Sequence, residues 1–344
     1  DKANSRLFAN GKLYGAKFNP DGTGDWIPLA PDTPINPILP SQIANVSPET
    51  AVVFLPNPDR QQAGASALFD DQAVAAYQAQ FKTLGDLYPV KEALKQGAIL
   101  VDAHLAANAI GVTPTARPED TEILPDGSVV VAFTAGGPSK SDGGCDRRIF
   151  QGPNGETPYE LGWIMRLQED GDRCYALTFR WQMIATGGEP AAGGMGFANP
   201  DNLAIDGRGD LWMVTDMSTT RHNQPFNRRA DAPSHQALGA FGNNSLWYLP
   251  LRGSLAGQAF PFALGPMDSE LTGPVFSQDQ KTLFLAVQHP GEVNGLRQQT
   301  TVDMPLTTTN GDPFNQTRTI PLLSHWPSGG ENPPRPAVVT IQLP

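Results

Sequence analysis

The feature that most constrains the fold is a short unit that occurs three times: a turn containing an aspartate, followed by an apolar run that ends near a polar residue. The copies are ILPDGSVVVAFT (123–134), AIDGRGDLWMVTD (204–216) and FSQDQKTLFLAVQHP (276–290). Short apolar runs bounded by Gly, Pro and Asp are typical of β-strands that follow tight turns. The copies start 81 and 72 residues apart, which is wider than one propeller blade of ~40–50 residues but suits a blade plus a long loop. The pattern predicts an all-β chain and favours a β-propeller over a β-sandwich.

The remaining segments predict one domain over residues 1–344 with a small helical insertion. NGKLYGAKFNPDGTGDWIPL alternates around a Pro-Asp-Gly turn and predicts a β-hairpin, whereas residues 31–60 are Pro-rich without periodicity and predict a long loop. Residues 65–110 are rich in Ala, Leu, Gln and Lys at helical spacing, and Pro89 separates two or three predicted helices.

Charge and missing motifs exclude several classes of protein. The chain has 35 acidic and 24 basic residues and a formal net charge of −11, so it would repel a phosphate backbone; we expect no nucleic-acid partner. No apolar run approaches the ~18–20 residues of a transmembrane helix. Serine-hydrolase elbows, nucleotide-binding loops, His-Glu-x-x-His and Cys-x-x-Cys are absent from the sequence.

The two cysteines leave two interpretations open. Cys145 and Cys174 flank a candidate strand at residues 162–167. They form either a disulfide in an oxidising compartment or two unrelated thiols.

Polar residues at the ends of the apolar runs indicate where chemistry could gather. Thr134, Asp216 and His289 end the three runs or follow them directly. The innermost strands of a propeller line its central channel, so their ends can bring distant residues to one channel mouth. Carboxylates collected in this way repel one another unless cations neutralise them, and the arrangement therefore predicts a metal site.

Further candidates stand beside strands, and each has an ordinary structural alternative. Arg117 and Glu119 are two apart in an extended segment, so their side chains point the same way; they suit a phosphate oxygen and a metal, or form a surface ion pair. Asp201, next to Asn202 in a predicted polar turn, and Glu270, in a predicted turn, offer oxygen ligands. His289 and His325 are either ligands or structural histidines.

Nine blocks in order resemble the PhoX-type alkaline phosphatase family. They are GKLYGAKFNPDGTGDWIPL, LAANAIGVTPTARPED, GWIMRLQEDGD, LTFRW, GFANPDNLAIDGRGDLWMVTD, FGNNSLWYLP, ELTGPVFSQDQKTLFLAVQHPGE, SHWP and RPAVVTIQL. The resemblance implies a six-bladed propeller holding Fe³⁺ and Ca²⁺ in its channel. It also implies a monomer that hydrolyses phosphate monoesters in the periplasm or outside the cell.

By this likeness Arg117 becomes a phosphate clamp, and the expected metal ligands are Glu119, Asp201, Asp216 and Glu270. The implied chemistry is Lewis-acid catalysis, in which cations hold the phosphate and a metal-bound oxygen attacks phosphorus. His289 follows the matching strand and is a weaker candidate.

Two departures from the family keep other functions open. The family's earlier Asn-Cys-x-Gly-Gly block, which supplies an iron-binding Cys, has no counterpart here, and FTAGG (133–137) replaces a Thr-Asn-Asn stretch. The sequence is therefore either a C-terminal portion of a phosphatase or a relative lacking part of the cluster. A non-catalytic calcium-binding propeller and a calcium-dependent lactonase remain alternatives.

Overall fold

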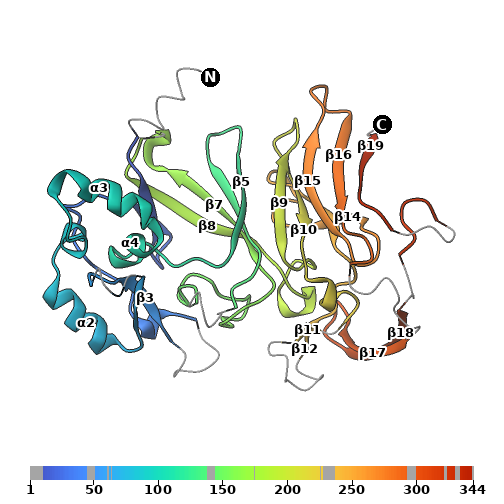
Figure 1. The fold of residues 1–344 in the computed structure, drawn as a ribbon. Coiled ribbons are helices and arrows are strands. Elements are labelled where there is room, and N and C mark those ends of the chain that lie inside the picture. Colours follow the sequence, from blue (N-terminus) through green and yellow to red (C-terminus); the bar gives the residue numbers. More distant parts are fainter. Residues whose placement is uncertain are drawn as a thin grey trace. The chain divides into compact units, whose positions relative to one another are not determined.

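The computed structural model is mostly β with few helices (Figure 1). It describes residues 11–44, 51–59, 62, 64–137, 144–173, 175–224, 226–227, 237–292, 300–320, 324–329 and 334–342. The chain divides into two compact units. Unit 1 comprises Asp1–Ala116, Gly137–Phe150 and Gln168–Trp181, and unit 2 comprises Arg117–Gly136, Gln151–Leu167 and Gln182–Pro344.

Unit 1 begins with the hairpin that the sequence predicts. Strands β1 (Tyr14–Phe18) and β2 (Thr23–Pro28) pair antiparallel from Tyr14↔Pro28 to Phe18↔Gly24. Gly22 has φ +85° in the connecting turn, a left-handed conformation that glycine adopts without a Cβ clash. The other edge of β2 pairs with the first residues of β8 (Thr178–Thr186).

The prediction of an unbroken loop over residues 31–60 is wrong at one place. Strand β3 (Val53–Pro56) forms there and pairs with β4 (Ala65–Leu68). Val53, Leu55 and Pro56 are buried, so β3 is a short apolar run without the alternation that would distinguish it from a loop by pattern.

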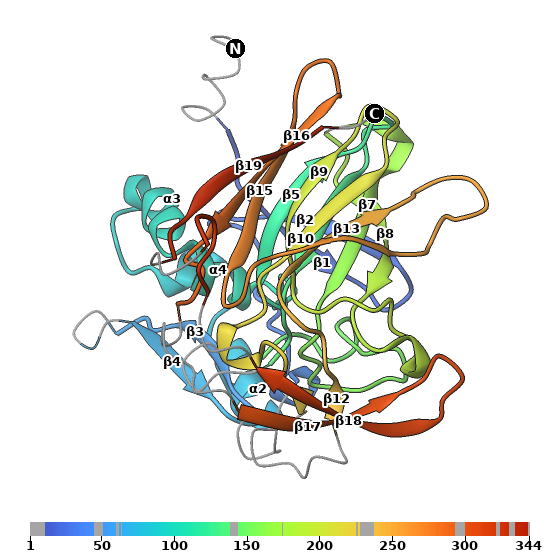
Figure 2. The same cartoon turned by 90° about the vertical axis from the view of Figure 1, so that its right-hand side faces the viewer.

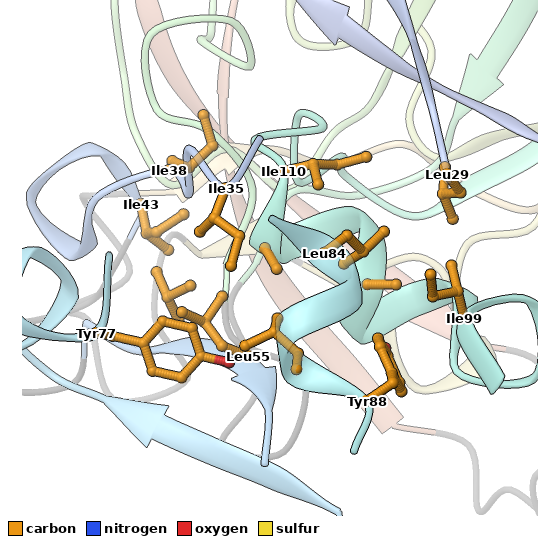
Figure 3. Close-up of a cluster of buried hydrophobic side chains, with 14 residues drawn as sticks. Leu29, Ile35, Ile38, Ile43, Leu55, Tyr77, Leu84, Tyr88, Ile99 and Ile110 are labelled. Atoms are coloured by element: carbon orange, nitrogen blue, oxygen red, sulfur yellow. The ribbon is translucent and has the colours of Figure 1, made fainter. Parts of the chain in front are cut away.

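Helices occupy the segment for which helices are predicted, and they share a core with the chain before them. They are α2 (Asp71–Gln80), α3 (Glu92–Val101) and α4 (Ala103–Ala109). Their buried side chains pack with residues 29–55, as Leu55, Leu84, Ile99 and Ile110 show in Figure 3. The Tyr77 hydroxyl in this core donates to the Pro56 carbonyl at 2.6 Å. That the helices are an insertion within a single propeller domain stays a prediction.

Unit 2 consists of antiparallel sheets and ribbons. Of the first, six-stranded sheet, unit 2 contains β7-β6-β5 in that order, and the second and third sheets have the orders β14-β13-β10-β9 and β15-β16-β19. Two-stranded ribbons form from β11 with β12 and from β17 with β18, and Figure 2 shows β17 and β18 near β12. The strands are β5 (Pro118–Ile123), β6 (Val129–Phe133), β7 (Trp163–Glu169), β9 (Pro200–Ile205), β10 (Leu211–Thr215), β11 (Phe226–Asn227), β12 (Ala237–Gly239), β13 (Ser245–Leu249), β14 (Phe260–Leu264), β15 (Glu270–Phe276), β16 (Thr282–Gln288), β17 (Thr300–Thr307), β18 (Pro313–Ile320) and β19 (Ala337–Gln342).

Short 3₁₀ turns complete the described elements: η2 (Pro40–Gln42), η4 (Leu84–Leu87), η5 (Asp170–Asp172), η6 (Pro190–Ala192) and η7 (Thr219–Arg221). Thr219, the first residue of η7, contacts Glu292, which is discussed below.

Strand β10 is buried on both faces, which explains its unbroken apolar sequence. Successive side chains of a strand point to opposite faces. Leu211 and Met213 join a core with residues of β6 and β7, whereas Trp212 and Val214 join a second core with residues of β15 and β16. The second sheet therefore packs between two apolar layers and is held firmly in place.

The three predicted turn–strand units are confirmed as β6, β10 and β16, and Thr134, Asp216 and His289 each directly follow one of these strands. A complete six-bladed propeller stays a prediction. The choice between a Cys145–Cys174 disulfide and two unrelated thiols involves Cys174, which lies outside the described residues; Cys145 is buried.

Candidate metal centre

Three carboxylates from three different strands meet in unit 2. Asp201, Asp216 and Glu270 each offer an oxygen, and these oxygens all lie within 4.8 Å of one another. Asp201 is the second residue of β9, Asp216 directly follows β10, and Glu270 is the first residue of β15. The sequence separates these positions by up to 69 residues, so only the strand arrangement brings them together.

The pairing of β9 and β10 places Asp201 beside Asp216. Thr215 pairs with Pro200 after a bulge in the ladder, and the Asp216 N–H donates to the Asn199 carbonyl at 2.9 Å. Asn199 has φ +53°, and its amide donates to the carbonyls of Thr134 and Glu160, both at 2.8 Å. Asn199 therefore fixes the backbone where the ends of β6 and β10 approach Asp201.

Asp201 and Asn202 lie in a strand, so the prediction of a polar turn at this point is wrong. Strand alternation sends the two side chains to opposite sides. The side-chain Oδ1 of Asn202 accepts hydrogen bonds from the Thr272 hydroxyl and from the Gly273 N–H, the latter at 3.0 Å. Asn202 thus ties β9 to β15, while Asp201 is 8% exposed and lies among the carboxylates.

Glu270 is also in a strand rather than in the predicted turn, and the end of β16 holds both of its oxygens. Gln288 pairs with Glu270 across the ladder and donates from Nε2 to Oε1 at 3.1 Å. Nε2 of His289 lies 3.3 Å from Oε2. Cross-strand pairing with β16 therefore overrides the turn-like local sequence DSELTGP.

Arg117 and Glu119 form the ion pair that their spacing suggests. The guanidinium Nη2 lies 3.3 Å from Glu119 Oε1, with the two side chains 68% and 27% exposed. Arg117 extends the β5–β6 pairing, since its N–H donates to the Ala135 carbonyl at 3.0 Å and its carbonyl accepts from Thr134 N–H at 2.9 Å. Strand β5 contacts β9, and the Glu119 charge acts on Asp201.

The electrostatics of these carboxylates disfavour their ionised forms. Burial, and then the charges of Glu119, Asp216 and Glu270, raise the pKa of Asp201 to about 7. Burial likewise raises the pKa values of the other three carboxyl groups. In Glu119 and Asp216 the positive charge of Arg117 opposes this rise in pKa. In Glu270 the contact with His289 opposes it. Burial is thus the main reason why these carboxyl groups favour their neutral forms in the metal-free protein.

This donor set fits a hard cation. Ca²⁺ takes carboxylate oxygens in flexible geometry. Because their pKa values are raised, these carboxyl groups tend to keep their protons in the metal-free protein. A bound cation would displace those protons and cancel the repulsion between the carboxylates. The residues present thus fit a calcium-type ion, with Asp201, Asp216 and Glu270 as its closest ligands and Glu119 beside them.

Three features around the carboxylates were not predicted from the sequence: the contacts of Glu292 with His289 and with Thr219, and the burial of Glu160. Glu292 Oε2 lies 3.5 Å from His289 Nδ1 and accepts from the Thr219 hydroxyl at 3.2 Å. Glu160 has a pKa raised by burial and opposed by the charges of Arg221 and Arg117. The segment VQHPGE contains His289 and Glu292, but its sequence gives no sign of which partners they contact. Within the described residues, His325 does not belong to the group formed by Asp201, Asp216 and Glu270.

The comparisons with known proteins identify a family and a similar fold. The sequence profile of the alkaline phosphatase PhoX family matches residues 1–291. The fold is similar to that of PhoX from Pseudomonas fluorescens, solved in complex with vanadate, a transition state analogue, at 25% identity and a TM-score of 0.53. The match covers 92% of this chain and 45% of that one, so the chain spans less than half the length of its solved relative. Among curated protein sequences, none is significantly similar.

The fold and the carboxylate group are those of a β-rich protein with a candidate metal centre. The chain belongs to the PhoX family of alkaline phosphatases. Within the described residues, no helix is both long and apolar enough to cross a membrane.

Proposed function

We propose that this chain carries the metal-binding part of a phosphomonoester hydrolase. The observation that supports this most strongly is the meeting of Asp201, Asp216 and Glu270 within 4.8 Å, in a chain that belongs to a phosphatase family. The vanadate bound to the Pseudomonas relative has the chemistry of a phosphoryl group in transfer, which supports phosphate esters as substrates.

The metal ligands in this proposal are Glu119, Asp201, Asp216 and Glu270. An all-oxygen donor set suits Ca²⁺, and Fe³⁺ is proposed as a second metal on the basis of the family resemblance. Bound cations would supply Lewis-acid chemistry and neutralise phosphate oxygens. The carboxylates, which lie at the start of β9, directly after β10 and at the start of β15, would hold those cations. Arg117, directly before β5, would lie beside them.

Arg117 would bind the phosphate group of the substrate. A planar guanidinium matches two phosphate oxygens at once, and it stabilises charge that develops on them. Arg117 is 68% exposed and therefore accessible to a substrate from solvent, while Glu119 at 3.3 Å and the backbone bonds to Thr134 and Ala135 restrain it.

We further propose that the protein acts as a monomer in the periplasm or outside the cell, as the family resemblance implies. The family match does not favour a non-catalytic calcium-binding propeller or a calcium-dependent lactonase.

The test is a metal-reconstitution assay with the complete gene product. Chelator-treated protein is incubated with Ca²⁺, Fe³⁺, both ions or neither, and hydrolysis of p-nitrophenyl phosphate is measured. Turnover that requires added metal and falls sharply in Arg117→Gln supports the proposal. Hydrolysis of a lactone without hydrolysis of the phosphate ester, or no metal-dependent turnover at all, would contradict it.

A further inference from the structure

Both oxygens of the Glu270 carboxylate are already held by the last residues of the neighbouring strand. Gln288 Nε2 donates to Oε1 at 3.1 Å, and His289 Nε2 lies 3.3 Å from Oε2. A glutamate side chain otherwise rotates about three bonds, so contacts to both oxygens fix the direction in which its remaining lone pairs point. These lone pairs are available to a cation shared with Asp201 and Asp216.

A second carboxylate lies on the other side of the His289 imidazole. Nδ1 faces Glu292 Oε2 at 3.5 Å, and that same oxygen accepts from the Thr219 hydroxyl at 3.2 Å. The turn that carries these residues is tied to the segment before β15, because Gly291 N–H donates to the Met267 carbonyl at 2.9 Å. Thr219, Glu292, His289 and Glu270 therefore form a chain of contacts that ends on the metal centre.

The backbone at His289 is in an unfavourable conformation. His289 has φ +33°, and Asp268, just before β15, has φ +54°. Residues with a Cβ adopt such angles at a cost in free energy, and they persist only where their surroundings hold them. The backbone angle at residue 289 would suit a glycine better, and the contacts made by the imidazole give a reason for a histidine.

We propose that His289 is a positioning residue, which orients Glu270 towards the cation without binding the cation itself. Nε2 is engaged with Glu270 Oε2 at 3.3 Å, so ligation through this nitrogen would require that contact to break, while Nδ1 lies 3.5 Å from Glu292 Oε2 without a hydrogen bond. Histidines and carboxylates that orient metal ligands in this way commonly contribute 10- to 100-fold, as an order of magnitude, to metal affinity. The inference rests on the proposed metal centre and assigns Glu292 as the residue that restrains the imidazole.

The experiment uses Tb³⁺ as a luminescent probe of the calcium-type site, in the complete protein. Affinity comes from titration, and the number of metal-bound waters comes from the luminescence lifetimes in H₂O and D₂O. We expect His289→Ala to weaken Tb³⁺ binding about 10- to 100-fold, with the number of bound waters unchanged. His289→Gln should restore most of the affinity, because its amide can donate to Glu270 from a similar reach, and Glu292→Gln should cause a smaller loss.

His104→Ala is the matched control, since His104 is exposed on α4 in unit 1. Equal affinity of wild type and His289→Ala overturns the positioning role while leaving the metal centre intact. A gain of one bound water in both His289 variants, with no rescue by Gln, shows that His289 is a ligand and also overturns it. No Tb³⁺ binding by the wild-type protein overturns the metal centre itself.

Discussion

Replacing Asp201 by Asn should have opposite effects on the metal-free and metal-bound protein. Burial and four neighbouring carboxylates raise the pKa of Asp201 from 3.8 to about 7. Each pKa unit corresponds to ~1.4 kcal/mol, so ionised Asp201 opposes folding of the metal-free chain by ~4 kcal/mol as an upper limit. Asn keeps the size and removes the charge.

The sign of the pH dependence follows from the direction of the pKa shift. The folded chain binds the Asp201 proton more tightly than the unfolded chain does, so this group favours folding below about pH 4 and ceases to do so as the pH rises to about 7. The metal-free wild-type protein should therefore lose stability over this range. Asp201→Asn should lose less, and near pH 8 it should be more stable than the wild type by ~2–4 kcal/mol.

The assay is urea unfolding followed by tryptophan fluorescence, with chelator and with excess Ca²⁺. Calcium should stabilise the wild type but give Asp201→Asn little or no stabilisation, because the variant has lost a charged ligand. Asp312→Asn, at an exposed position in the turn between β17 and β18, is the control and should respond as the wild type does. A metal-free Asp201→Asn protein that is less stable than the wild type near pH 8 would refute the reasoning.

Four further outcomes are expected. Calcium affinity, measured by calorimetry, should fall as the pH is lowered through about 7, because the cation must displace the Asp201 proton; a flat profile would count against this. Arg117→Gln should weaken inhibition by inorganic phosphate by ~1.5–3 kcal/mol, about 10- to 100-fold, with calcium binding retained; unchanged inhibition would remove Arg117 from the phosphate site. Asn199→Ala should destabilise the protein by ~2–4 kcal/mol, because it removes the hydrogen bonds to the Thr134 and Glu160 carbonyls. Asn199→Gly should destabilise it less than Ala does, because φ +53° suits glycine. A Gly variant less stable than the Ala variant would contradict this. Glu270→Gln should lower Tb³⁺ affinity at least as much as His289→Ala, and a smaller loss would show that Glu270 is not a ligand.

The sequence predicts the strands of unit 2 well because burial leaves a local pattern. The apolar run 211–215 is bounded by turn residues, and it forms β10 with Asp216 directly after it. The strand-end pattern predicts that polar residues such as Asp216 gather in one place, whereas Asp201 and Glu270 enter as metal ligands through the family resemblance. The described residues bring oxygens of all three within 4.8 Å of one another.

The contacts around these carboxylates could not be predicted, because they depend on register between distant strands. Asn202 looks like a turn residue or a calcium ligand in the sequence, yet its side-chain Oδ1 accepts hydrogen bonds from Thr272 and Gly273, about 70 residues further along. Gln288 reaches Glu270 only because β15 and β16 pair in the observed register. Local propensity contains no information on such partners.

In the helical segment, the sequence pattern predicts the helices but not the residues against which they pack. Helices α2, α3 and α4 lie within residues 65–110 as predicted. Their core includes Ile35 and Leu55, from a stretch that the sequence presents as a Pro-rich loop. Burial of that stretch depends on its partners, and no periodicity within it reveals them.

The most direct test of the account is a crystal structure of the protein grown with Ca²⁺, with anomalous diffraction used to locate the ions. The account predicts an anomalous peak ~2.3–2.6 Å from an oxygen of each of Asp201, Asp216 and Glu270. Well-ordered density for all three side chains, with no ion between them at saturating Ca²⁺, would contradict it.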